Sequence, residues 1–139
     1  YPSNAPFPFS PTCSLMNFTY FREDEVLILC TKRKTKKFAQ ISGNAEVAVL
    51  INDFPLLRAD NGIPGSAATG TSTGSITLNG TAEALRDSDP LAVKYRAVHL
   101  ANNEQYAHFI EGEDIAVIVI RFDAARICDF KDQVKHWQR

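Results

Sequence analysis

Short β-prone runs separated by turn residues are the feature of this 139-residue chain that most restricts its fold. The runs either alternate apolar and polar side chains or consist mainly of Val, Ile and Leu, which is typical of half-buried and fully buried strands. Helical patterns occur only as inserts, which favours an antiparallel barrel over a doubly wound sheet. The sequence therefore predicts a mainly β (α+β) fold, a six-stranded antiparallel barrel with short helices, with strands at residues 14–21, 26–31, 47–51, 75–85, 115–120 and 125–130.

Turn signals mark the connections between these runs. The charged residues 22–25 predict a tight turn that makes an antiparallel hairpin of the first two strands. Gly80 is expected to interrupt the fourth strand with a bulge, and a turn near Asp123 is expected to separate the last two. Residues 54–74 hold two prolines and four glycines and are predicted to form a flexible loop.

Capping residues predict the helices. Thr35 can cap a short helix that ends at Gly43. Asp89 followed by Pro90 predicts a second helix start, and residues 105–110 a third, shorter helix. In the second helix the positions that recur at helical spacing are Leu91, Tyr95 and Val98.

Length and composition limit the organisation and the partners. A chain of 139 residues with 45% hydrophobic residues suffices for one domain, expected to span 1–139 with an extended N-terminal segment at 1–12. The formal net charge of -1 gives no whole-surface attraction to nucleic acid or to anionic membranes. No apolar run approaches the roughly 20 residues that span a bilayer, and the start lacks the regions of a signal peptide. Three cysteines without C-x-x-C spacing fit a reducing compartment, so we expect a cytoplasmic protein.

A cluster of cations follows the second predicted strand. Five of the 15 Lys and Arg residues lie at positions 32–37, where a buried strand is followed by a helix start. A helix start leaves unpaired backbone N–H groups and the positive end of the helix dipole pointing outward. Thr31, Thr35, Lys36 and Lys37 therefore form a candidate phosphate site.

Two other interpretations of this basic cluster stay open. A charged run on a surface is often only a solvated turn, and short basic clusters also resemble nuclear-localisation signals and nucleic-acid patches. Binding to a duplex requires basic residues spread over a face, whereas the rest of this chain is acidic on balance. The position of the cations at a strand-to-helix junction favours a phosphate, and a nuclear location in addition to the cytoplasm stays open.

Motifs of other enzyme classes are absent from the sequence. It contains no G-x-S-x-G, H-E-x-x-H, Rossmann glycine fingerprint or spaced Cys and His set, so neither a metal site nor a catalytic residue is predicted. We interpret the histidines as structural or surface residues, and three acidic residues as turn and cap residues: His99, His108 and His136, and Glu83, Asp87 and Asp89.

Three segments together resemble the pyridoxamine 5′-phosphate oxidase-like family. They are a Leu-x-x-Cys-Thr-x-x-x-Thr-Lys-Lys motif ending at Lys37, an N-x-x-V strand start at residues 44–50, and the strand at residues 76–82. The resemblance covers roughly residues 13–130, and fungal members are similar. It implies the FMN-binding split-barrel fold and a homodimer with two flavins at the subunit interface.

The resemblance also implies roles for particular residues. The family binds the FMN phosphate at motif positions that are Thr31, Thr35, Lys36 and Lys37 in this chain. A strand glutamine that contacts the flavin in the family is replaced by Ser75. The family's oxidases carry cations on their first strand and spaced arginines with a Trp near the C-terminus, and residues 15–20 and 134–139 offer no clear counterpart.

Two functions remain as hypotheses. One is an FMN-dependent oxidoreductase of unknown substrate that does not oxidise pyridoxamine phosphate, in which the protein positions the cofactor. The alternative is a non-catalytic binding protein that keeps the split barrel and has weak or lost FMN affinity. The colour of freshly purified protein distinguishes them.

Overall fold

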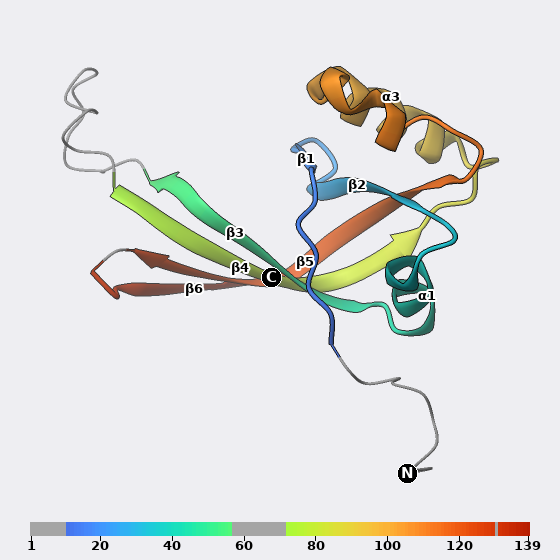
Figure 1. Cartoon of the computed structure of the whole chain (residues 1–139). Coiled ribbons are helices and arrows are strands. Elements are labelled where there is room, and N and C mark those ends of the chain that lie inside the picture. Colours follow the sequence, from blue (N-terminus) through green and yellow to red (C-terminus); the bar gives the residue numbers. More distant parts are fainter. Residues whose placement is uncertain (1–10, 57–71, 130) are drawn as a thin grey trace, which may run out of the picture. The chain divides into compact units, whose positions relative to one another are not determined.

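The strands form one six-stranded antiparallel sheet (Figure 1). This computed structural model describes residues 11–56, 72–129 and 131–139. The strand order is β1-β2-β5-β4-β3, and β6 pairs with β5. The elements are β1 (Thr19–Phe21), β2 (Val26–Lys32), α1 (Lys36–Gly43), β3 (Glu46–Leu56), β4 (Ser72–Ala84), α3 (Pro90–Asn102), the 3-10 helix η1 (Glu104–Phe109), β5 (Ile115–Asp129) and β6 (Val134–Gln138).

The chain divides into two compact units. The first unit contains the described residues up to Glu46 together with Ala82–Arg121. The second contains the described residues within Val47–Thr81 and Phe122–Arg139. The long strands β4 and β5 contribute residues to both units. Within the described residues, none of the helices is both long enough and apolar enough to cross a membrane.

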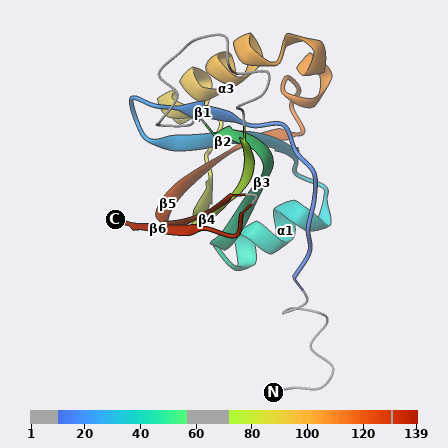
Figure 2. The same cartoon turned by 90° about the vertical axis from the view of Figure 1, so that its left-hand side faces the viewer.

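The core of the first unit lies between α3 and the central strands. Figures 1 and 2 both show α3 beside the β1–β2 hairpin. β2 and β5 pair with Ile28 opposite Val119, which places alternate side chains of both strands on the face that packs against α3. The buried residues of this cluster are Val26, Ile28, Leu85, Ala92, Tyr95, Val117 and Val119.

Several local predictions are confirmed. β1 and β2 form the expected antiparallel hairpin, with the turn at residues 22–25. The Thr35 side chain caps α1, which ends at Gly43. The Asp89 side chain accepts a hydrogen bond from the Leu91 backbone N–H, with Pro90 as the first residue of α3. Of the three predicted positions on α3, Tyr95 is buried and Val98 packs against the core, whereas Leu91 is 36% exposed. Ala92 and His99 are the other buried residues of the helix.

The first predicted strand is much shorter in the structure. Only Thr19–Phe21 is paired, starting at Thr19 opposite Ile28. Apolar and polar side chains alternate from residue 14 onward, but residues 14–18 form no strand. Their apolar side chains have no core to pack against, and Leu15 is fully exposed. An extended hydrophobic residue without a burial partner gives a strand no stabilisation.

The predicted turn near Asp123 is wrong. β5 runs from Ile115 to Asp129 as one strand, pairing with β2 over its first half and with β6 over its second half. Asp123 does not end β5, because the residues before it are hydrogen-bonded to β2 and those after it to β6. The strand β6 (Val134–Gln138) was not predicted.

Strands β3 and β4 are longer than predicted. β3 extends from Glu46 to Leu56, beyond the expected end at residues 52–53. β4 runs from Ser72 to Ala84 and is not divided at Gly80; the bulge expected there stays a prediction. Of the predicted loop at 54–74, residues 54–56 and 72–74 are therefore strand, and 57–71 lie outside the described residues.

A buried polar network joins β1 to the end of α3. Thr19 Oγ1 lies 2.7 Å from His99 Nδ1, and both residues are at most 6% exposed. Asn103 Nδ2 donates to Thr19 Oγ1 at 3.1 Å and lies 3.2 Å from His99 Nδ1. Asn103 Nδ2 also donates to the His99 backbone carbonyl at 3.0 Å, so the three side chains form one buried network. The prediction that His99 is structural agrees with this arrangement.

We expect His99 to make folding sensitive to acid. Burial lowers the pKa of His99 below its ordinary value of 6.5, so the unfolded chain binds a proton more readily than the folded one. The stabilisation that neutral, buried His99 gives to the folded state is complete above the ordinary pKa of 6.5. It is lost as the pH falls through the lower pKa of His99 in the folded state. In thermal unfolding between about pH 7.5 and pH 5, His99→Asn should flatten the decline in Tm. His108→Asn, at an exposed position, is the control, and an unchanged slope for His99→Asn would contradict the prediction.

Candidate functional site

The basic turn between β2 and α1 is held by the hydroxyl of Thr35. Its Oγ1 accepts a hydrogen bond from the Phe38 backbone N–H at 3.2 Å and donates to the Lys32 carbonyl at 2.8 Å. The first bond satisfies one of the unpaired N–H groups of the helix start, and the second closes the turn onto the end of β2. Thr35 therefore has a structural role, and its hydroxyl hydrogen is already engaged.

Lys36 and Lys37 occupy the first two positions of α1. The first turn contains no acidic residue. Cations at this end oppose the helix dipole, which favours negative charge there by about 0.3–1 kcal/mol at exposed sites. Local sequence rules are most often broken at functional sites. An anion bound at this helix start would remove the electrostatic conflict.

Four lysines of the basic turn have no ion pair within the described residues: Lys32, Lys34, Lys36 and Lys37. Lys37 is partly buried and the other three are exposed. Their charges are therefore not compensated by any described carboxylate. A compact anion such as phosphate could contact several ammonium groups and the backbone N–H groups of the first turn.

Arg33 differs from these lysines because its guanidinium is bound inside the first unit. Nη2 forms a 2.7 Å ion pair with Asp87, and Nη1 donates to the Glu113 carbonyl at 2.7 Å. Arg96 contacts the same carboxylate at 3.4 Å and donates to the Ile110 carbonyl at 2.6 Å. Asp87 thus accepts from two arginines, a role that its interpretation as a turn residue missed. No local pattern could reveal it, since Arg33 and Asp87 are 54 positions apart.

The remaining predicted site residues lie on strands. Thr31 is 6% exposed and shares its face of β2 with Leu27 and Leu29, by strand alternation. The structure thus brings Thr31, Thr35, Lys36 and Lys37 into one β2–α1 segment of the first unit. Ser75 is partly buried on β4 and belongs to the second unit.

Three other reactive side chains of the first unit are buried or paired. Burial raises the pKa of the Cys30 thiol to about 11, so the nucleophilic thiolate is scarce at neutral pH. Burial and a 2.6 Å hydrogen bond to Asp24 raise the pKa of Tyr95 to about 12. Glu83 forms a surface ion pair with Arg121 at 3.4 Å. Among the described residues there is no group of three or more His, Cys, Asp or Glu side chains that could hold a metal ion.

Comparisons with known proteins define the fold and then the family. A heme-binding protein of Mycobacterium smegmatis superimposes with a TM-score of 0.69 at 18% identity, covering 93% of this chain and 48% of the other. The heme storage protein HutZ of Vibrio cholerae superimposes with a TM-score of 0.55 at 9% identity, covering 78% and 69%. This chain thus spans about half the length of the mycobacterial protein. These similarities confirm the split-barrel fold.

Sequence similarity identifies the family more specifically. A pyridoxamine 5′-phosphate oxidase homologue of Schizosaccharomyces pombe is 31% identical over 152 residues, covering 94% of this chain and 80% of the relative. The protein therefore belongs to the family of pyridoxamine 5′-phosphate oxidase homologues, as the sequence motifs predicted. No family model matches the chain.

Proposed function

We propose that this protein is an FMN-binding flavoprotein that holds the cofactor's phosphate at the β2–α1 turn. The observation that carries the proposal is the set of lysines at a helix start with no described carboxylate partner. Membership of the oxidase-homologue family supplies the ligand class. FMN would bring redox chemistry to the protein, which makes an oxidoreductase of unidentified substrate the proposed activity.

The residues of the turn would have different roles in binding FMN. Lys36 and Lys37 would contact the phosphate through their ammonium groups, together with the backbone N–H groups at the start of α1. Thr35 would act mainly by fixing this turn, because its hydroxyl hydrogen bonds to the Lys32 carbonyl. Direct contacts from Thr31 to the phosphate and from Ser75 to the flavin are part of the proposal.

Titration with FMN tests the proposal directly. Addition of purified protein should quench flavin fluorescence in a saturable manner, and freshly purified protein should be yellow. Two similar structures are a heme-binding and a heme storage protein, so hemin is titrated in parallel as the second candidate ligand. Saturable binding of hemin without binding of FMN would overturn the proposal. Binding of neither would favour the non-catalytic protein.

The second unit provides an argument for a homodimer. Among its residues whose exposure is described, only Gly80 and Phe122 are buried. Leu50 on β3 is 65% exposed and Trp137 on β6 is 46% exposed. A sheet needs at least one covered face to be stable, and a second copy of the chain would cover this one symmetrically. We therefore propose that the second unit contributes the dimer interface.

Light scattering should give a mass near twice that of the 15.4 kDa chain. Leu50→Asp should shift the mass toward one chain, because it would bury a carboxylate in the interface. Val93→Asp is the matched control, since Val93 is 66% exposed but lies on α3 of the first unit. A single-chain mass for the unmodified protein at working concentration would contradict both the dimer and a shared flavin site.

A further inference from the structure

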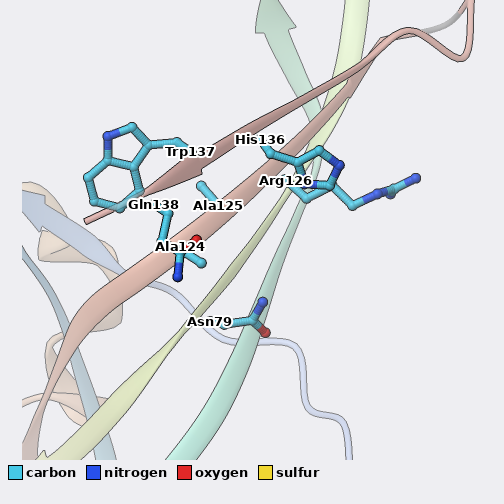
Figure 3. Close-up of a pocket in the computed structure, with 7 residues that line it drawn as sticks. All are labelled: Asn79, Ala124, Ala125, Arg126, His136, Trp137 and Gln138. Atoms are coloured by element: carbon cyan, nitrogen blue, oxygen red, sulfur yellow. The ribbon is translucent and has the colours of Figure 1, made fainter.

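We propose that the β5–β6 hairpin carries a second anion site, for the carboxylate or phosphate group of a small organic ligand. An open hollow lies on this hairpin in the second unit. It is lined by Asn79 of β4, residues 124–126 of β5 and residues 136–138 of β6 (Figure 3). The proposal concerns a different part of the chain from the β2–α1 turn and holds whether or not FMN binds.

The centre of the proposed site is a cross-strand pair of nitrogen-rich side chains. Arg126 and His136 are directly opposite each other in the β5–β6 register. Figure 3 shows their side chains next to each other, with Trp137 directed elsewhere. Within the described part of the chain, neither side chain has a hydrogen bond or ion pair, and both are exposed. No described group therefore occupies their donors.

The surroundings of the pair favour an anion. No carboxylate lines the hollow, although the whole chain has a formal net charge of -1. By strand alternation, the residues that share the face of Arg126 and His136 on the hairpin carry no charge: Ala124, Cys128, Val134 and Gln138. The positive charge of Arg126 is thus uncompensated on its own face of the hairpin.

The donor geometry favours an oxyanion group over a halide or a neutral ligand. A guanidinium presents paired N–H groups that match two oxygens of a carboxylate or phosphate. An imidazole has at least one N–H donor in either protonation state, and the amides of Asn79 and Gln138 add further donors. Ala124, which shares the face of Arg126, adds only a small side chain to the lining of the hollow.

NMR of the full chain can detect this binding locally. Inorganic phosphate and succinate are titrated separately, while the backbone amides of residues 124–128 and 134–138 and the Arg126 side-chain N–H are monitored. We expect saturable shifts with at least one of the two anions, unchanged in Lys36→Ala/Lys37→Ala, which separates this site from the β2–α1 turn. Saturation by phosphate alone would indicate a phosphate ester, and by succinate alone a carboxylate. Both results support the site.

Variants then assign the site to the pair. Arg126→Ala should weaken the anion's affinity by at least about tenfold, and Arg126→Lys by less, because lysine lacks the paired N–H groups. His136→Ala should also weaken binding. Lys135→Ala removes one positive charge from the opposite face of the same strand and should leave the affinity unchanged. The proposal is overturned if neither anion gives saturable shifts, or if Lys135→Ala weakens binding as much as Arg126→Ala.

Discussion

Replacing Lys36 and Lys37 together with alanine is expected to weaken FMN binding by about 100-fold. Hydrogen bonds to charged groups contribute roughly 1.5–3 kcal/mol each, and the exposed position of Lys36 places this pair at the lower end of that range. Loss of two such contacts therefore costs about 3 kcal/mol of binding free energy, where 1.4 kcal/mol corresponds to tenfold. Fluorescence titration with FMN measures the change.

The same substitution should not damage the fold, which separates binding from stability. Alanine is the best helix former, and removing two cations from the start of α1 relieves their repulsion with the helix dipole. The thermal unfolding midpoint should stay constant or rise slightly. Lys131→Ala/Lys135→Ala, two exposed positions of the second unit, makes the same change in net charge and serves as control. Equal FMN affinity in the two double variants would place the phosphate elsewhere.

The purified protein with FMN in excess is expected to oxidise pyridoxamine 5′-phosphate at less than about a tenth of the rate of a genuine oxidase, a barrier difference of about 1.4 kcal/mol. Correct placement of a reactant can lower a barrier by roughly 7–11 kcal/mol, so loss of the groups that hold the substrate's phosphate is severe. Residues 11–21 contain no Lys or Arg. Leu15 is fully exposed, and Tyr20 on β1 is half-exposed.

Arg139 at the end of the C-terminal strand does not replace these cations. Arg139 Nε donates to the Phe122 carbonyl at 3.0 Å, and its guanidinium lies 5.7 Å from the Trp137 ring centroid. These contacts tie Arg139 to the second unit instead of leaving it to bind substrate. Formation of pyridoxal 5′-phosphate is the readout, with a genuine oxidase assayed under the same conditions. Turnover within tenfold of that enzyme would refute the prediction.

Local patterns in the sequence were sufficient to predict the fold class and the basic turn. The apolar run of β2, the Thr35 cap and the Asp89-Pro90 helix start are each formed by residues only a few positions apart. Such features are encoded by neighbouring residues, because backbone preference and capping involve groups only a few positions apart. The motif that ends at Lys37 predicted the family for the same reason.

The sequence alone determined where β2 ends, where α1 begins, and that cations gather between them. The tertiary structure decided which of those cations are available, because Arg33 is neutralised by Asp87 and four lysines of the turn have no described ion pair. It also decided that residues 115–129 form one strand and that β6 pairs beside it. The Arg33–Asp87 ion pair and the pairing of β5 with β2 depend on partners distant in the chain, whereas β6 pairs with β5 as its neighbour along the chain. In both cases the backbone hydrogen bonds or charges of the partner override the local signals only once the strands are assembled.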